Sequence, residues 1–242
     1  MCGVETKTEA KEDCLICGKL LVYEQAAYEA KCSGCSQIIL TNCECEDGHF
    51  ICDTCHSSTS MPVIFHYCAN TDKRDPYVIA NEIMKNPTIH MHGPENHVLI
   101  GSALLAAYRN SGGSIDIEDA LTKMRQRGSQ LPGSICGLWG NCGAAVSAGI
   151  FTSIITGSTP LSTDSWGLCN LMTSECLKSI SEPGGPRCCK RNGFLSIVTA
   201  TAFVAEHLQI QMELPEKIEC THTPRNKECI QERCPFYMGK TS

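Results

Sequence analysis

Cysteine is the residue type that most constrains this chain, because 19 of its 242 residues are cysteines. Eight of them fall within residues 14–55, a stretch with few large apolar side chains and so too little material for a hydrophobic core. Residues 1–21 contain no apolar run behind a basic start, so we expect neither a secretory signal nor a disulfide framework. This many thiols indicates metal ligation or redox chemistry in a reducing cytoplasm, as in an anaerobe.

Two Cys-x-x-Cys pairs open the cysteine-rich stretch. They are Cys14-Leu-Ile-Cys17 and Cys32-Ser-Gly-Cys35, separated by 14 residues. Two pairs at this distance can place four thiolates at the corners of a tetrahedron, about 2.3 Å from a zinc ion. The spacing therefore predicts one zinc ion bound by these four cysteines.

A second zinc ion is predicted from the residues that follow. We expect Cys52 and Cys55 to bind it together with two of Cys43, Cys45 and His49. The order of these ligands resembles that of RING-like and treble-clef modules, and the spacing leaves open whether the two sites interleave. The zinc is expected to be structural, with docking to protein or nucleic acid as the alternative.

The fold class predicted for the whole chain is α+β. A small β-rich module of the zinc-ribbon or treble-clef type (residues 1–60), with strands near 19–23 and 37–41, precedes a mainly helical domain (61–214) and a Cys-rich tail (215–242). Caps and apolar spacing predict six helices, over about residues 75–86, 94–110, 116–128, 141–155, 165–181 and 192–208. The small residues of the fourth helix are suited to close packing, and its apolar run is too short to cross a membrane.

A histidine-rich segment, residues 89–97, lies outside the cysteine stretch. Pro94 sets a helix start, so His90 and His92 lie on the preceding loop while Glu95 and His97 fall in the first turn. These side chains can converge on a catalytic zinc or iron ion, or bind another cofactor, with a neutral His97 as ligand or base. The alternative is that they cap the helix and bond across the loop.

Four cysteines of the helical domain are candidates for a joint redox, iron-sulfur or other metal site. Cys142, Cys188 and Cys189 are predicted at helix N-termini, where thiols acquire lowered pKa values and become reactive, and Cys136 precedes the first of these helices. Three basic side chains flank Cys188 and Cys189, namely Arg187, Lys190 and Arg191. They would favour a thiolate or bind an anionic or sulfur-containing ligand. The alternative is a set of buried, inert thiols.

The tail carries further metal-ligand types, Cys220 with His222 and Cys229 with Cys234. The final Cys234-Pro235 resembles the end of ferredoxin cluster motifs, but the Cys-x2-Cys-x2-Cys run of those motifs is missing. A third zinc knuckle and a share in the helical-domain site both remain open.

Taken together, these motifs resemble those of a domain family of unknown function from methanogenic archaea and anaerobic bacteria. The motifs are the zinc-like knuckles, His-x-His-Gly-Pro-Glu-x-His, Gly-Gly-Pro-Arg-Cys-Cys-Lys-Arg and Asn-Lys-Glu-Cys-x4-Cys-Pro. Some members of that family are associated with S-adenosylmethionine-dependent methyltransferases. The chain has no glycine-rich nucleotide-binding turn, so we do not expect methyl transfer. Residues 136–153 are also similar to redox proteins with a Gly-Cys-Ala signature.

The sequence therefore predicts a metal-thiolate protein with about two zinc ions, an iron-sulfur cluster as a further cofactor, and a redox or sulfur-handling site. The first alternative is a non-catalytic, zinc-dependent adaptor for a partner enzyme, and the second is an RNA-modification accessory. Whether the chain is an enzyme stays open. With a net charge of −6 there is no general basic field, so we expect a protein partner and no binding to membrane or nucleic acid.

Overall fold

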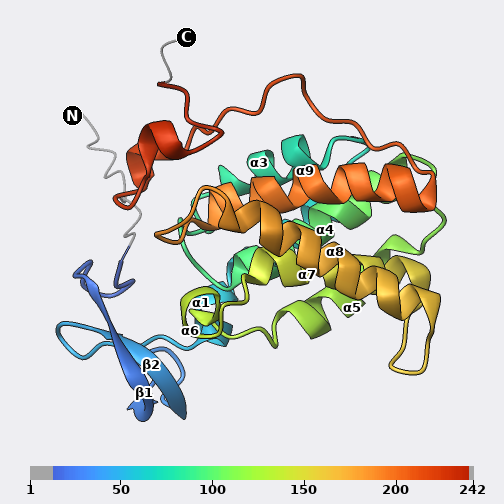
Figure 1. Ribbon diagram of the computed structural model, residues 1–242. Helices are drawn as coiled ribbons and strands as arrows, with labels where there is room; N and C mark the ends of the chain where they lie inside the picture. Colours follow the sequence, from blue (N-terminus) through green and yellow to red (C-terminus); the bar gives the residue numbers. More distant parts are fainter. Residues whose placement is uncertain (1–12, 240–242) are drawn as a thin grey trace, which may run out of the picture. The chain divides into compact units, whose positions relative to one another are not determined.

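The structure, a computed structural model, describes residues 13–239 and contains two compact units, residues 1–55 and 56–242 (Figure 1). The outermost parts of the predicted zinc module and of the predicted tail, residues 1–12 and 240–242, lie outside the described residues. The α+β class is confirmed, because a two-stranded sheet precedes a mainly helical region.

The sheet of the first unit is an antiparallel pair, β1 (Leu21–Lys31) and β2 (Ile38–Cys45). Leu21 lies opposite Cys45, and the register shifts between Tyr23 and Tyr28. The two predicted strands are confirmed in position, but both extend further towards the C-terminus than the apolar runs indicated.

The first unit has no apolar core among its described residues. Within residues 13–55 the buried side chains are Cys14, Cys32, Cys45 and Cys52. Most of β1 is exposed, so the sheet buries no apolar face. Something other than apolar burial must hold this unit together.

Helices make up most of the remaining chain. They are α1 (Asp53–Ser57), α2 (Ser60–Asn70), α3 (Pro76–Met84), α4 (Glu95–Asn110), α5 (Ile117–Gly128), α6 (Ile135–Leu138), α7 (Gly143–Thr156), α8 (Asp164–Ser181) and α9 (Cys189–Leu208), followed by the short turns η1 (Thr223–Arg225) and η2 (Gln231–Arg233). The six predicted helices are confirmed as α3, α4, α5, α7, α8 and α9. The sequence reasoning missed α1, α2 and α6.

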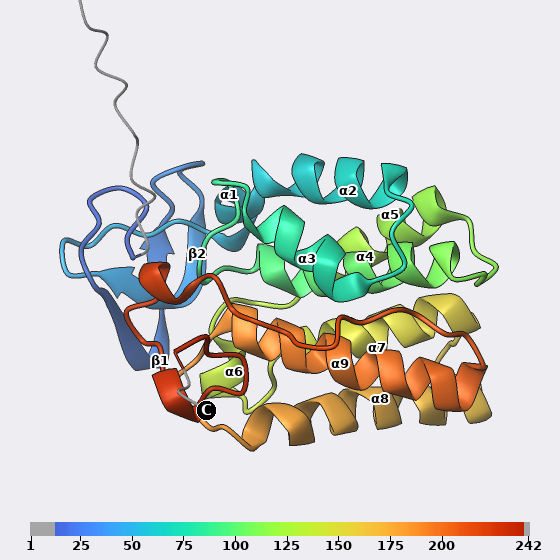
Figure 2. The same cartoon turned by 90° about the horizontal axis from the view of Figure 1, so that it is seen from above.

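Helix α4 forms the centre of the second unit. Every residue from Glu95 to Ala107 is buried, and α4 contacts α2, α3, α5, α7 and α9. Figure 2 shows α8 and α9 along one side of this unit and α2 along the other. Two of the surrounding helices begin at an ordinary N-cap, since the Asp75 and Asp116 carboxylates accept backbone N–H groups at the starts of α3 and α5.

The small residues of α7 allow neighbouring helices to approach closely, as predicted. The Gly101 amide of α4 donates a 2.8 Å hydrogen bond to the Ser147 hydroxyl of α7. A Cβ atom at Gly149 would lie 3.2 Å from the Cys169 carbonyl oxygen of α8 and would collide with the Thr173 hydroxyl. The backbones of α7 and α8 therefore pack at a distance that only small side chains permit.

The segment after α9 runs back over the helices. The Tyr77 hydroxyl of α3 donates a 2.8 Å hydrogen bond to the Glu219 carbonyl, and the Cys220 amide donates one of 2.8 Å to the Phe236 carbonyl. Phe236 is buried in the helical core. Among the described residues, the helices are all too short or too polar to span a membrane.

Candidate metal centres

The first cluster of metal-ligand side chains in the first unit consists of Cys14, Cys17, Cys45 and His49. The Sγ atoms of Cys17 and Cys45 lie 3.7 Å apart, and His49 Nδ1 lies 3.5 Å from Cys45 Sγ and 3.9 Å from Cys14 Sγ. Tetrahedral zinc with Zn–S bonds of about 2.3 Å separates its sulfur ligands by about 3.8 Å. The spacing of this cluster therefore fits one four-coordinate ion.

The second cluster consists of Cys32, Cys35, Cys52 and Cys55. Cys35 and Cys52 have Sγ atoms 3.9 Å apart, and the amides of Gly34 and Cys52 each donate a 3.3 Å hydrogen bond to Cys32 Sγ. Burial opposes the Cys32 thiolate, but the backbone donors outweigh it and lower the Cys32 pKa to about 6. Gly34 is suited to this turn, because a Cβ there would lie 3.1 Å from Cys55 Sγ.

The grouping of ligands predicted from spacing is wrong, because the two Cys-x-x-Cys pairs belong to different clusters. The sheet register explains this. Leu21 pairs with Cys45, which brings β2 back to the first pair, whereas Cys32 forms a bridge with Phe50, which brings the Cys52 turn to the second pair. The clusters therefore interleave along the chain. Cys43, the remaining candidate, lies in β2 and belongs to neither.

A third group, in the second unit, joins two histidines to a carboxylate. Glu95 Oε2 lies 3.2 Å from His56 Nδ1, and Glu95 Oε1 lies 3.1 Å from His90 Nδ1. The Glu95 side chain is fully buried. Burial opposes its ionised form, but the two imidazoles outweigh this and hold the Glu95 pKa well below its usual range.

The histidine-rich segment does not converge as a whole. His90 and Glu95 meet, but His92 Nε2 lies 2.8 Å from the Glu228 carboxylate, and His97 Nδ1 lies 3.2 Å from the Leu131 carbonyl oxygen. The sequence reasoning also missed His56 as a partner of Glu95. His56 directly follows Cys55 of the second cluster, and nothing in the local sequence indicates a contact with a residue 39 positions away.

The starts of α4, α7 and α9 lie near one another, although their candidate ligands stay apart. A Cβ at Gly143, the first residue of α7, would collide with the His97 ring of α4, and the Asn192 amide of α9 donates a 3.4 Å hydrogen bond to Cys142 Sγ. None of the three groups whose ligand atoms lie within 4.8 Å of one another includes Cys136, Cys142, Cys188 or Cys189.

The predicted lowering of the thiol pKa values at these helix starts is wrong. Burial raises the pKa of Cys142 and of Cys189, and it raises that of Cys188 to about 12. Backbone N–H donors act in the opposite direction but are weaker than desolvation; they belong to the first helical turn for Cys142 and Cys188, and to Gly93 for Cys189. The expectation from helix polarity fails because the surrounding protein partly or fully desolvates these thiols.

Two of the three basic residues near Cys188, Lys190 and Arg191, are buried, whereas Arg187 is half-buried. The Lys190 ammonium is fully buried, lying 2.7 Å from the His90 carbonyl oxygen and 3.0 Å from Asn96 Oδ1. Arg191 is also buried and donates to the Pro186 carbonyl oxygen at 2.9 Å. Arg187 lies close enough to Cys136 and Cys189 to favour their thiolates.

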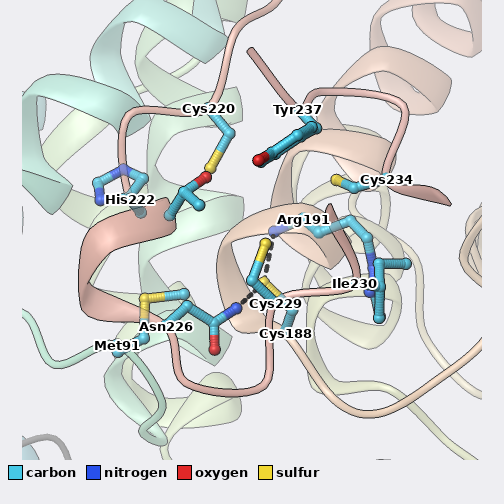
Figure 3. A pocket seen from close by; sticks show the side chains of 11 residues that line it. Met91, Cys188, Arg191, Cys220, His222, Asn226, Cys229, Ile230, Cys234 and Tyr237 are labelled. Carbon is cyan, nitrogen blue, oxygen red and sulfur yellow. Dashed lines mark hydrogen bonds between the residues drawn. The ribbon is translucent and has the colours of Figure 1, made fainter. Parts of the chain in front are cut away.

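A pocket between the start of α9 and the C-terminal segment is lined by four cysteines (Figure 3). They are Cys188, Cys220, Cys229 and Cys234. The three tail cysteines predicted as metal ligands therefore line a pocket with Cys188. The other candidate cysteines of the helical domain do not line it. His222 also lines the pocket, but its Nε2 lies 3.2 Å from Asn81 Oδ1 of α3.

Hydrogen-bond donors surround two of the pocket sulfurs. Cys188 Sγ accepts from the Arg191 amide at 3.4 Å and from the Asn226 side chain at 3.5 Å, as the dashed lines in Figure 3 mark. Cys229 Sγ accepts from the Gln231 amide at 3.4 Å. N–H groups directed at sulfur stabilise a thiolate and tune the clusters that thiolates bind.

The sequence profile of a family of unknown function, DUF5714, matches residues 64–237, and the chain belongs to this family. The match includes the four-cysteine pocket, His90 and Glu95, and it begins after the two cysteine clusters of the first unit. Comparison with curated proteins and with solved structures gave no match.

Proposed function

We propose that this member of DUF5714 is a metal-thiolate redox protein with an iron-sulfur cluster bound by Cys188, Cys220, Cys229 and Cys234. Two zinc ions in the first unit have a structural role. The observation that carries the proposal is the convergence of these four cysteines, from three separate parts of the chain, on one pocket.

The zinc assignment follows from the ligand sets. Each cluster of the first unit offers four protein ligands: three cysteines and a histidine in the first, and four cysteines in the second. A tetrahedral zinc ion with four protein ligands has no position open for a substrate. Since the buried side chains of residues 13–55 are all ligand cysteines, metal binding takes the place of a hydrophobic core.

The pocket cysteines favour a polynuclear cluster over a third zinc ion. Ligands of a single zinc ion must lie within about 4 Å of one another. The pocket cysteines are not among the groups whose ligand atoms lie within 4.8 Å of one another. An iron-sulfur cluster needs wider spacing, because each cysteine binds a different iron atom or shares one iron with only one other cysteine.

The surroundings of the pocket support a cluster that stays bound and exchanges electrons. Cys188 and Cys234 are buried, whereas Cys220 and Cys229 are partly exposed. Solvent exposure and N–H donors to sulfur are two means by which a protein sets a cluster's reduction potential. An oxygen-sensitive cluster also agrees with the resemblance to proteins of anaerobes, and the eighteen free thiols of residues 13–239 agree with a reducing cytoplasm.

A protein partner belongs to the same proposal, because an electron-transfer site must receive its electron from a second molecule or pass it on to one, and we assign this role to another protein. Apolar side chains are exposed at the connection between α7 and α8 and at the start of α8, where Leu161 is 94% and Trp166 is 53% exposed. The adaptor hypothesis uses the same side chains as a docking surface, without electron transfer.

Purification without oxygen tests the proposal. We expect zinc together with equal amounts of iron and acid-labile sulfide, and an electron paramagnetic resonance signal after reduction. Cys229→Ser should lose most of the iron while keeping the zinc. Cys169→Ser is the matched control, since this partly exposed cysteine of α8 does not line the pocket. Zinc alone, even after reconstitution with iron and sulfide, would overturn the redox proposal in favour of the adaptor.

A further inference from the structure

The triad of His56, His90 and Glu95 has no role in the four-cysteine pocket or in the zinc clusters. Its centre is a carboxylate with no exposed surface, and such a group is costly to bury unless positive charge compensates it. The ion pairs of the Glu95 side chain are with His56 and His90. One oxygen also accepts the His90 backbone N–H at 2.9 Å.

The separations of the three ligand atoms match those around a metal ion. Nitrogen and oxygen ligands bind zinc at about 2.0–2.2 Å, so adjacent ligands lie about 3.0–3.5 Å apart in octahedral or tetrahedral geometry. The observed separations are 3.2 Å between His56 Nδ1 and Glu95 Oε2 and 3.1 Å between His90 Nδ1 and Glu95 Oε1, two different oxygens of the same carboxylate. All three ligand atoms lie within 4.8 Å of one another.

Several residues hold the triad in this arrangement. The Lys190 ammonium donates to the His90 carbonyl oxygen, and Arg225 donates to the Ile89 carbonyl oxygen at 3.2 Å, so the loop that presents His90 is fixed from two sides. A Cβ at Gly93 would come closer than 3.0 Å to both Glu95 carboxylate oxygens and to His56. The glycine therefore leaves the space that the carboxylate and the imidazole occupy.

The triad is closed on one side and accessible on the other. The Glu95 side chain is fully buried, whereas those of His56 and His90 are 18% and 17% exposed. Two histidines and one carboxylate supply only three ligands, the usual number for a catalytic zinc site and for non-haem iron(II) sites that keep positions open. Water or a small exogenous ligand would complete the coordination from the exposed side.

We propose that His56, His90 and Glu95 bind one divalent first-row transition metal ion of the zinc or iron(II) class, with at least one position open to water. The site would be separate from the thiolate sites, because its ligands are nitrogen and oxygen. It does not depend on the iron-sulfur proposal.

Cobalt(II) titration of the full chain, with both zinc clusters occupied, tests this site. We expect one further equivalent of cobalt with weak visible absorption and no sulfur-to-cobalt charge-transfer band, because cobalt bound at a cysteine site would show that band. Glu95→Gln should weaken this binding by about 100-fold or more, since loss of even a residue that only orients a metal ligand typically costs about 10–100-fold. His56→Ala should do the same if Glu95→Gln fails to fold.

Two controls make the result specific. Glu228→Gln removes the carboxylate beside His92, a neighbouring histidine-carboxylate pair outside the triad, and should leave cobalt binding unchanged. Cys229→Ser should also leave it unchanged, which separates this site from the four-cysteine pocket. Absence of a sulfur-free cobalt site in the wild type, or equal binding by folded Glu95→Gln, would overturn the proposal.

Discussion

The two interleaved clusters of the first unit should bind zinc almost independently, and Cys32→Ser is the substitution that tests this. Cys32 is fully buried and belongs to the second cluster. A serine hydroxyl is a poor zinc ligand, so the variant should lose the second zinc ion. The first cluster, which contains Cys17 and Cys45, keeps all of its ligands.

The expected loss of affinity at the intact first cluster can be worked out from the chain between its two halves. Cys17 and Cys45 are separated by the 27 residues from 18 to 44, and the second cluster normally cross-links this segment to the Cys52 turn. With the second cluster in place, the shorter path from Cys17 to Cys45 runs through residues 18–31 and 46–51, which is 20 residues. Loss of the cross-link therefore lengthens the loop that zinc must close from 20 to 27 residues, at about 0.3 kcal/mol by the (3/2)RT ln n relation. Zinc at the first cluster should bind less than about twofold more weakly.

Competition with a chelator of known zinc affinity measures this change. In Cys32→Ser the remaining zinc ion should transfer to the chelator at a chelator concentration within about twofold of the wild-type value. Cys43→Ser is the matched control, because Cys43 lies on β2 and belongs to neither cluster. An affinity of the first cluster that falls about tenfold or more in Cys32→Ser would show that more than loop closure couples the two sites and would refute the reasoning.

Two further predictions concern stability. Removing zinc with a chelator should abolish the sheet while preserving most of the helical far-ultraviolet circular dichroism, since the hydrophobic core lies entirely in the second unit. A helical signal that falls in step with zinc release would contradict this. Gly149→Ala should lower the free energy of unfolding by about 1–2 kcal/mol in denaturant titrations, because overpacking against α8 exceeds the gain of about 1 kcal/mol in helix propensity. Adding Thr173→Ala removes the colliding hydroxyl and should restore stability; if the double variant is no more stable than Gly149→Ala, the collision is not the cause.

Most of the helical unit could be predicted because its signals are local. The caps at Asp75 and Asp116 and the proline before α4 lie within a few residues of the helices they start. Helix α2 was missed although Met61, Ile64 and Cys68, all buried, are spaced along one helical face. The signal was present, and the predicted helical domain began at residue 61, but the first helix was predicted only from residue 75.

For the metal centres, the sequence could predict which residues are ligands but not which of them bind the same ion. Which cysteines share an ion depends on the sheet register, and the pairing of Leu21 with Cys45 cannot be derived from Cys-x-x-Cys spacing. The contact between His56 and Glu95 spans 39 residues and depends on how the start of α4 packs. Residue types identify metal ligands, but tertiary packing decides which of them meet.

The pKa values of the helical cysteines bear on how this protein could carry out redox chemistry. Cys142 precedes α7 directly, where helix polarity favours a thiolate, yet burial raises its pKa, and burial also raises the pKa of Cys136. A thiol whose pKa is raised stays protonated at neutral pH and is a slow nucleophile, so a cycle of thiolate attack and disulfide exchange at these two residues is disfavoured. A bound metal ion changes this balance, because its positive charge deprotonates the cysteines it coordinates. The redox proposal therefore rests on a metal cluster in the four-cysteine pocket and does not rest on the free thiols at the start of α7.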